Sequence, residues 1–284
     1  MPQCVLITGA SSGLGEALAK EHAAVGDALV LLARRRDRLK SVAEACRNLG
    51  AAKVALCVGD VTRRVDVQRA AKAAAAMGGL DIAYANAGYS QSGTLESMSL
   101  EDWRRQMEVN VEGVLHTVQT CVPMLKASRG RLAIVGSVTG FGSLADSGAY
   151  SASKAAVRAL AQVLDLELAP VGISVTLVAP GFFASEIRKK KANGAPDPTA
   201  PEYIPRFLLG DPVKVARAVR KAVLRRKHEL ILPLHAKSAV FFLRHFPGLS
   251  QILARRLSRA RLARRAAVQG RGPSSGLAKE SRIR

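Results

Sequence analysis

The sequence has few aromatic residues, few acidic residues and no recognisable set of metal ligands. Aromatic residues make up 4% of its 284 residues, and 22 Asp and Glu stand against 43 Lys and Arg. Its five histidines and four cysteines form no CxxC or HExxH spacing, so we expect no metal site. The cysteines are scattered in or near apolar segments, which predicts reduced thiols in a cytoplasmic protein: Cys4, Cys46, Cys57 and Cys121.

Long apolar segments and targeting segments are missing as well. No run of 18 apolar residues suggests a helix that spans a membrane. The first residues already read as a buried strand, Cys4-Val5-Leu6-Ile7, so we expect no signal peptide. Hydrophobic residues nevertheless make up 48% of the chain, which is enough for one large core.

Apolar strand segments alternate with helical segments along most of the chain. This alternation predicts an α/β fold with a doubly wound parallel sheet that helices cover on both faces. A ligand is then expected at the carboxyl ends of the strands. The expected strands are 4–7, 28–33, 53–58, 80–85, 131–136, 173–179 and 229–232. The expected helices are 16–25, 36–48, 63–76, 101–127, 151–169 and 211–227.

A glycine-rich turn follows the first strand and precedes the first helix. Strand, glycine turn and helix together form the context of a dinucleotide-binding fingerprint. Gly9 permits the tight turn, Gly13 lets a pyrophosphate approach the backbone, and Gly15 allows the helix to pack closely on the strand. The spacing is GxxxGxG instead of the commoner GxGxxG, so by itself it is equally compatible with a plain strand-to-helix turn. The turn comprises Gly9, Ala10, Ser11, Ser12, Gly13, Leu14 and Gly15.

Tyr150 and Lys154 lie four residues apart in an Ala-rich helical segment. That spacing places both side chains on one helix face. A nearby ammonium favours the phenolate and lowers the pKa of a tyrosine, which makes the pair suitable for acid–base chemistry near neutral pH.

Further motifs follow in a fixed order, and the ordered set resembles the short-chain dehydrogenase/reductase family. The resemblance covers residues 3 to about 232 and implies a Rossmann-type fold with a catalytic tetrad of Asn110, Ser137, Tyr150 and Lys154. The motifs that carry it are the glycine turn, Asn86-Ala87-Gly88, Asn110, Ser137, Tyr150, Lys154 and Pro180-Gly181.

The resemblance also implies a reaction, in which a hydride passes between a nicotinamide and a carbonyl or secondary alcohol carbon. Tyr150 exchanges the proton of the substrate oxygen, and Ser137 hydrogen-bonds that oxygen. Lys154 holds the nicotinamide ribose, and Asn110 fixes a water that leads to solvent. The implied cofactor-binding residues are Gly9, Ser11, Ser12, Gly13, Leu14, Gly15, Arg34, Asp60, Asn86, Tyr150, Lys154, Pro180 and Gly181.

The residues at the end of the second expected strand indicate which cofactor is preferred. Ala33 stands where an acidic residue would hold the ribose hydroxyls of NAD, and Arg34 follows it. A guanidinium matches a phosphate, so in this family the arrangement implies NADP. Asp60 is expected to bind the adenine amino group or to cap the next helix. Asn86 is expected to tie strands together beside the cofactor.

Two classes of function remain open. The first is an NADP-dependent oxidoreductase for a small or lipophilic carbonyl or alcohol, such as a steroid, retinoid or keto-lipid. The second is a non-catalytic protein that keeps the fold and senses NADP, although the complete tetrad favours the enzyme. We expect a homo-oligomer in either case.

The positive charge is concentrated in the last third of the chain. Residues 1–187 hold 19 basic and 17 acidic side chains, whereas residues 188–284 hold 24 basic and 5 acidic ones. We therefore divide the chain into an NADP-binding domain at 1–235, a basic amphipathic extension at 236–267 and a disordered tail at 268–284. Residues 182–210 correspond to the segment that covers the substrate in the family.

The extension has an aromatic patch at 238–246, followed by an expected helix from Leu249. Leu249, Ile252, Leu253 and Leu257 share one side of that helix, with arginines around the rest. This pattern is typical of a helix that lies on an anionic membrane surface, here on the cytoplasmic side. Packing on the core or on a second subunit is the alternative, and a nucleic-acid contact is a weaker one.

Overall fold

The computed structural model describes residues 2–143, 145–181 and 210–269, with side chains described up to residue 259. Its centre is one sheet of seven parallel strands in the order β3-β2-β1-β4-β5-β6-β7. The seven strands confirm the expected ones, with boundaries shifted by one or two residues. They are β1 (Cys4–Thr8), β2 (Ala28–Ala33), β3 (Lys53–Val58), β4 (Ile82–Ala85), β5 (Arg131–Val135), β6 (Ser174–Pro180) and β7 (Glu229–Leu232).

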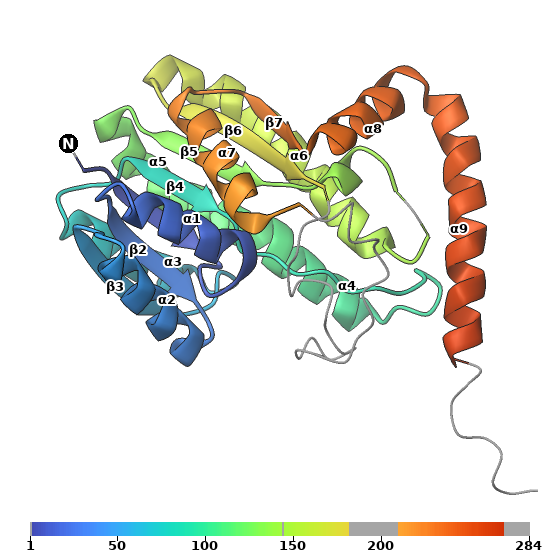
Figure 1. The fold of residues 1–284 in the computed structure, drawn as a ribbon, viewed down its shortest axis with the longest axis horizontal. Coiled ribbons are helices and arrows are strands. Elements are labelled where there is room, and N and C mark those ends of the chain that lie inside the picture. The colour runs from blue at the N-terminus through green and yellow to red at the C-terminus, as the bar shows by residue number, and fades with distance from the viewer. Residues whose placement is uncertain (1, 144, 182–209, 270–284) are drawn as a thin grey trace, which may run out of the picture.

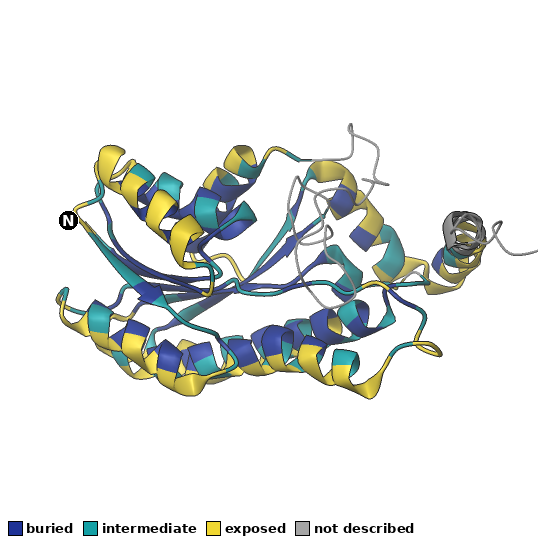
Figure 2. Cartoon of the chain, turned by 90° about the horizontal axis from the view of Figure 1, so that it is seen from below, coloured by how far each residue is buried: buried dark blue, intermediate teal, exposed yellow. Residues whose placement is uncertain are grey.

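Two layers of helices cover the sheet, and each layer turns its buried side inward (Figure 2). The apolar side chains of α1 (Gly13–Ala23), α2 (Arg36–Asn48) and α7 (Pro212–Leu224) pack on one face. Those of α3 (Arg64–Ala75), α5 (Gly113–Ser128) and α6 (Gly148–Leu168) pack on the other face. The doubly wound α/β fold predicted from the alternation is confirmed.

One long helix expected at 101–127 is divided in the structure. Helix α4 (Leu100–Met107) is followed by a π-helical turn, Glu108–Glu112, and then by α5. A π turn inserts an extra residue into the helical ladder and often marks a functional position. Asn110 lies inside this turn, which hydrophobic periodicity could not reveal.

The strand order reverses between β1 and β4. The chain runs from β1 outward to β2 and β3, then crosses back to β4 on the other side of β1. The carboxyl ends of β1 and β4 therefore lie side by side with their connections leading away in opposite directions. Ligands of open parallel sheets bind in the crevice at such a switch point.

Two helices follow the last strand, α8 (Leu234–His245) and α9 (Pro247–Gln269). Helix α9 stands at one end of the molecule, beyond α8 and apart from the helices that cover the sheet (Figure 1, Figure 2). The boundary expected at residue 235 falls inside α8, whose Ala236 and Val240 are buried. Within the described residues, no helix is long and apolar enough to cross a membrane.

Candidate active site

The glycine turn after β1 has the backbone geometry that the fingerprint requires. Gly9 and Gly13 adopt positive φ angles of 69° and 58°, which L side chains rarely adopt. A Cβ at Gly15 would collide with the carbonyl group of Gly9. Helix α1 can therefore begin directly against the turn that follows β1.

The helix α1 presents its N-terminus to the crevice. Ser12 is the N-cap residue, and its side chain does not cap the helix. The first backbone N–H groups of the helix therefore remain available as donors, and the helix dipole adds positive potential. This is the arrangement that binds a pyrophosphate, so the turn fits a dinucleotide. Ser11 and Leu14 are buried beneath it.

Asn86 joins the ends of β1 and β4. Its side-chain amide donates to the carbonyl oxygens of Thr8 at 2.8 Å and Gly9 at 3.4 Å. The Thr8 hydroxyl accepts from the backbone N–H groups of Asn86 and Ala87, both at 3.0 Å. Asn86 thus has the strand-joining role expected of it. The role of Thr8 could not be predicted from the sequence, because an isolated threonine at a strand end carries no signal.

Three charged side chains lie at the ends of β2 and β3. Arg34 is within 3.4 Å of the Asp60 carboxylate, and half of its side chain is exposed. Asp60 also accepts from the Thr62 backbone N–H at 3.1 Å, which caps the turn before α3. Arg35 instead lies over the glycine turn, where its guanidinium donates to the Ser11 hydroxyl at 3.4 Å. From the sequence, Arg35 suited a solvated helix start better than a cofactor contact, because three consecutive arginines do not show which one folds inward.

Ser137 follows β5 and is buried. Its hydroxyl oxygen accepts from the Thr139 backbone N–H at 3.2 Å and from the Thr139 hydroxyl at 2.9 Å. Both contacts use the oxygen as acceptor, so the Ser137 proton stays available for another acceptor. Thr139 was not identified from the sequence.

Lys154 is buried on α6, one helical turn after Tyr150. Its Nζ donates to the Val135 carbonyl oxygen at 2.8 Å and lies 5.8 Å from the centre of the Tyr150 ring. Only 3% of Lys154 is exposed, and this burial lowers its pKa to about 8. A strongly perturbed, buried lysine at the crevice of an α/β sheet is typical of a functional site.

Asn110 hydrogen-bonds the backbone of the loop that follows β4. Its Oδ1 accepts from the Tyr89 backbone N–H at 2.9 Å, and its Nδ2 donates to the Tyr89 carbonyl at 3.0 Å. The same Nδ2 donates to the Ser153 hydroxyl on α6 at 3.0 Å. A Cβ at Gly88 would lie 3.1 Å from the Asn110 Oδ1 and 3.5 Å from the Lys154 Nζ. The π turn therefore joins the loop after β4 to the helix that carries Tyr150 and Lys154.

Pro180 ends β6, and the Gly181 backbone N–H donates to the Leu232 carbonyl at 2.7 Å. This places the Pro180-Gly181 pair at the same carboxyl edge as the other motifs. The expected substrate-covering segment at 182–210 lies almost wholly outside the described residues.

The four cysteines are free thiols, and all are buried. Burial raises the pKa of Cys4 and Cys46 to about 11, which leaves them protonated and unreactive. They take no part in the site.

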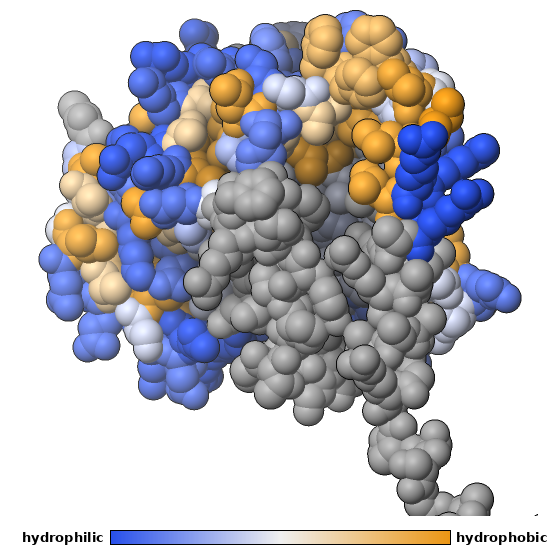
Figure 3. All heavy atoms as spheres, turned by 45° about the vertical axis from the view of Figure 1, so that its right-hand side comes forward, coloured by the Kyte–Doolittle hydropathy of each residue, from blue (hydrophilic) through white to orange (hydrophobic). Residues whose placement is uncertain are grey.

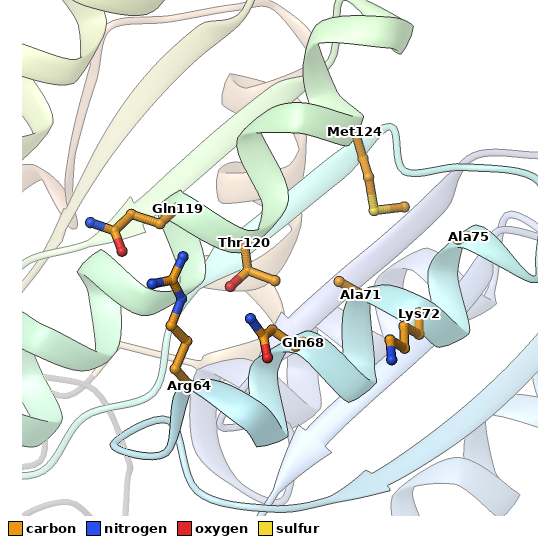
Figure 4. Close-up of a pocket in the computed structure, with 8 residues that line it drawn as sticks. All are labelled: Arg64, Gln68, Ala71, Lys72, Ala75, Gln119, Thr120 and Met124. Atoms are coloured by element: carbon orange, nitrogen blue, oxygen red, sulfur yellow. The ribbon is translucent and has the colours of Figure 1, made fainter.

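The surface also has an open groove of about 490 Å³ between α3 and α5. Figure 4 shows its lining, with Arg64, Gln68 and Lys72 on α3 and Gln119 and Thr120 on α5. None of the tetrad residues lines this groove. The candidate active site is therefore the carboxyl edge of the sheet, where the tetrad residues and the glycine turn lie.

Taken together, the sheet and the crevice define a doubly wound α/β protein with a dinucleotide-type glycine turn. A family model described as short chain dehydrogenase matches residues 3–195. The chain belongs to the short-chain dehydrogenase family of oxidoreductases.

Relatives and solved structures agree with this assignment. The chain is 35% identical over 225 residues to an uncharacterized oxidoreductase of Staphylococcus aureus (strain N315), covering 78% of this chain and 91% of the relative. It is similar to a short-chain dehydrogenase structure from Streptomyces avermitilis, with a TM-score of 0.72, 30% identity and coverage of 93% and 98% of the two chains. It is also similar to an alcohol dehydrogenase from Thermococcus sibiricus complexed with 5-hydroxy-NADP, with a TM-score of 0.71, 29% identity and coverage of 82% and 96%.

Proposed function

We propose that the protein is an NADP(H)-dependent oxidoreductase that interconverts a carbonyl group and a secondary alcohol. The observation that carries the proposal is the network around Lys154. This buried lysine lies beneath the Tyr150 ring, contacts the strand end that leads to Ser137, and neighbours the Asn110 amide across Gly88. Among the described residues, no acidic side chain shifts the pKa of Lys154. Burying a lysine without such a partner is costly for folding, which favours a functional reason for keeping it.

The glycine turn, the α1 N-terminus and the charged groups after β2 and β3 fit a phosphorylated dinucleotide. When bound, that cofactor would supply the hydride. The α1 backbone N–H groups would hold its pyrophosphate, and Lys154 would bind its nicotinamide ribose. Arg34 and Arg35 would bind the 2′-phosphate of NADP, because a guanidinium pairs well with phosphate oxygens.

Each tetrad side chain has its own role in the proposed reaction. The Tyr150 hydroxyl donates its proton to the substrate oxygen in reduction and takes it back in oxidation. The Ser137 hydroxyl donates a hydrogen bond to the same oxygen, which stabilises the charge that develops on it. Lys154 favours the phenolate form of Tyr150, and Asn110 holds the loop and the helix in register. The water expected beside Asn110 remains a prediction.

The exposed side chains of α8 and α9 support a proposal for the substrate class. Exposed leucine and phenylalanine side chains gather on α8 and α9, which favours a lipophilic substrate such as a steroid, retinoid or keto-lipid. The buried, free thiols favour a cytoplasmic location, and a homo-oligomer is expected as for many proteins of this size. A sensor that binds NADP without chemistry would have no use for the complete tetrad.

A screen of candidate substrates tests the proposal. The purified chain is mixed with NADPH and, in separate reactions, with ketosteroids, long-chain 3-keto lipids, retinal and small diketones, and NADPH consumption is followed. We expect turnover with at least one lipophilic carbonyl, and at least about a hundredfold less turnover with the Tyr150→Phe variant. Tight NADPH binding without turnover of any compound, in either direction, would support the sensor instead.

A further inference from the structure

Helix α9 carries its large apolar side chains on the side that faces solvent. Leu249, Ile252, Leu253 and Leu257 are 55%, 53%, 50% and 52% exposed. They recur at the spacing of one helix face, so they form a continuous apolar stripe and not four isolated residues. A helix of a single folded domain normally turns such a stripe toward its own core.

The side of α9 that faces the body carries small residues instead. Ser250 is buried, and Ala254 and Ser258 are half-buried, at successive intervals of four residues. The Ser250 hydroxyl donates to the Phe242 carbonyl at 3.3 Å, and the Ser258 hydroxyl accepts from the Ala145 backbone N–H at 3.0 Å. These contacts attach α9 to α8 and to the segment at Ala145 through small residues, while its leucines remain outside. Packing of the stripe on the chain's own core, one of the alternatives left by the sequence, is therefore not what the structure has.

Helix α8 extends the same apolar surface. Ala236 and Val240 are buried against the body, whereas Leu234, Phe241 and Phe246 are 79%, 58% and 48% exposed. Figure 3 shows the hydrophobic side chains gathered at this end of the molecule, with strongly hydrophilic ones directly beside them. We call the exposed apolar residues of both helices the C-terminal apolar surface: Leu234, Phe241, Phe246, Leu249, Ile252, Leu253 and Leu257.

The charge beside this surface has one sign. Arg255 and Arg259 are exposed at one edge of the stripe. Arg256 is also exposed and lies within the stripe, because it follows Ile252 by four residues and Leu253 by three. Within the described residues, these three arginines form no ion pair. The sequence contains no Asp or Glu between residues 230 and 279. A basic flank next to an apolar stripe is complementary to anionic headgroups above hydrocarbon chains.

We propose that the C-terminal apolar surface docks on an anionic lipid surface, with the leucines in the headgroup layer and the arginines against lipid phosphates. A second copy of this chain fits less well, because it would bring an equal positive charge to the contact. A nucleic acid would satisfy the arginines and leave the leucines in water.

The docked helices also contact the segment that links two catalytic residues. Ala145 and Gly142 lie between Ser137 and Tyr150, and a Cβ at Gly142 would overlap the Leu243 side chain of α8. The ring of Phe141 lies between the guanidinium groups of Arg158 and Arg244, at 4.8 and 4.7 Å. The lipid surface would thus lie next to the wall of the active site. Delivery of a substrate from the lipid rests on the proposed function, whereas the lipid contact itself does not.

Co-sedimentation with vesicles tests the contact without any assay of activity. The full chain is mixed with vesicles of phosphatidylcholine alone or with equal phosphatidylglycerol. We expect binding only to the anionic vesicles, weakening as salt rises. Replacing Arg255, Arg256 and Arg259 by Gln should weaken binding about a hundredfold, since each basic residue near the surface contributes about fivefold. Replacing Leu249, Ile252, Leu253 and Leu257 by Gln should abolish it.

Matched controls separate the proposed surface from general charge and hydrophobicity. The Lys221→Gln, Arg225→Gln, Lys227→Gln variant removes three exposed charges from the end of α7, and Leu49→Gln with Val65→Gln removes two exposed apolar residues. Both should bind vesicles like the unchanged chain.

Equal losses in the controls would overturn the proposal, and so would leucine variants that still bind vesicles. A leucine variant that changes only the oligomeric state, measured by light scattering, would assign the surface to a second copy. Retained vesicle binding by Tyr150→Phe keeps this test independent of the proposed reaction.

Discussion

Lys154 on α6 donates a hydrogen bond of 2.8 Å from its Nζ to the carbonyl oxygen of Val135 at the end of β5. The lysine lies 3% exposed, and burial lowers its pKa to about 8. The folded protein therefore holds this ammonium at a cost that an unfolded chain, with an ordinary lysine pKa near about 10.4, does not have. The hydrogen bond to Val135 offsets part of that cost. The remainder lowers the free energy of unfolding of the protein.

The Lys154→Met variant should be more stable than the unchanged chain at pH 7, by about 1 to 2 kcal/mol in the free energy of unfolding. Methionine fills similar space without a charge, so the variant avoids the cost of burying an ammonium. Between pH 8 and about 10.4 the unfolded lysine binds more protons than the folded one, so the free energy of unfolding of the unchanged chain rises with pH. By pH 10 this gain is about 2.5 kcal/mol, so the advantage of the variant should vanish or change sign.

Urea unfolding of both proteins without cofactor, at pH 7 and pH 10, measures this difference directly. The variant should also lose turnover. A variant that is less stable at pH 7, with a difference that does not depend on pH, would show that Lys154 is held as a structural donor only.

Tyr150→Phe should reduce turnover at least about a hundredfold and leave NADPH affinity nearly unchanged. The substitution removes the hydroxyl that moves the proton but keeps the ring, and general acid catalysis is typically worth 10² to 10⁴. Steady-state kinetics on a substrate from the screen, together with NADPH fluorescence titration, give both quantities. Near-normal turnover at an unchanged unfolding midpoint would remove Tyr150 from the mechanism.

Arg34→Gln and Arg35→Gln should each weaken NADPH binding about tenfold or more while leaving NADH binding unchanged. Each loses a charge-assisted contact to the 2′-phosphate, which NADH lacks. Arg36→Gln is the matched control, because Arg36 is the exposed third arginine of the same run. Adding Ala33→Asp to an Arg34→Ile variant should move the preference toward NAD by supplying a ribose acceptor.

Titration calorimetry with both cofactors separates the two arginines. If only Arg34→Gln weakens NADPH binding, then Arg35 contacts Ser11 for a structural reason and does not bind the 2′-phosphate. Equal binding of NADH and NADPH by the unchanged chain would contradict the NADP assignment altogether.

A buried cluster of His22, Asp27 and Tyr84 should make the free energy of unfolding depend on pH below neutrality. The His22 Nδ1 lies 2.6 Å from the Asp27 carboxylate, and its Nε2 lies 2.9 Å from the Tyr84 hydroxyl. Burial lowers the pKa of His22, although its hydrogen bond to Asp27 acts in the opposite direction. The folded histidine therefore stays neutral at pH values where the unfolded one binds a proton.

Because the unfolded state binds that proton, the free energy of unfolding should fall as pH drops below about 6.5, by up to about 1.4 kcal/mol per pH unit. His22→Gln removes the titration, so the gap between it and the unchanged chain should narrow from pH 6.5 to pH 5. His228→Gln is the control, because His228 pairs with Asp165 at the surface and is 81% exposed. A gap that stays constant over this range would mean that His22 does not titrate on unfolding.

The sequence determined the sheet and most of the motif positions, for a local physical reason. Short apolar runs between turn residues, such as Leu29 to Leu32, indicate buried strands, and glycines before a helical segment indicate a turn. Those signals lie within a few residues of each other, so they are readable without the fold. The break at Asn110 was not readable, because the π turn depends on the contact of that amide with Tyr89 and Ser153 from distant segments.

Tertiary structure alone decided which of several similar side chains face the site. The run Arg34-Arg35-Arg36 is uniform in sequence, yet one arginine pairs with Asp60 and another lies over Ser11. The leucines of α9 predict an amphipathic helix, but not that small residues at Ser250 and Ser258 would turn toward the body. Periodicity fixes which residues share a helix face, whereas the partners that an element meets in space determine which face is covered.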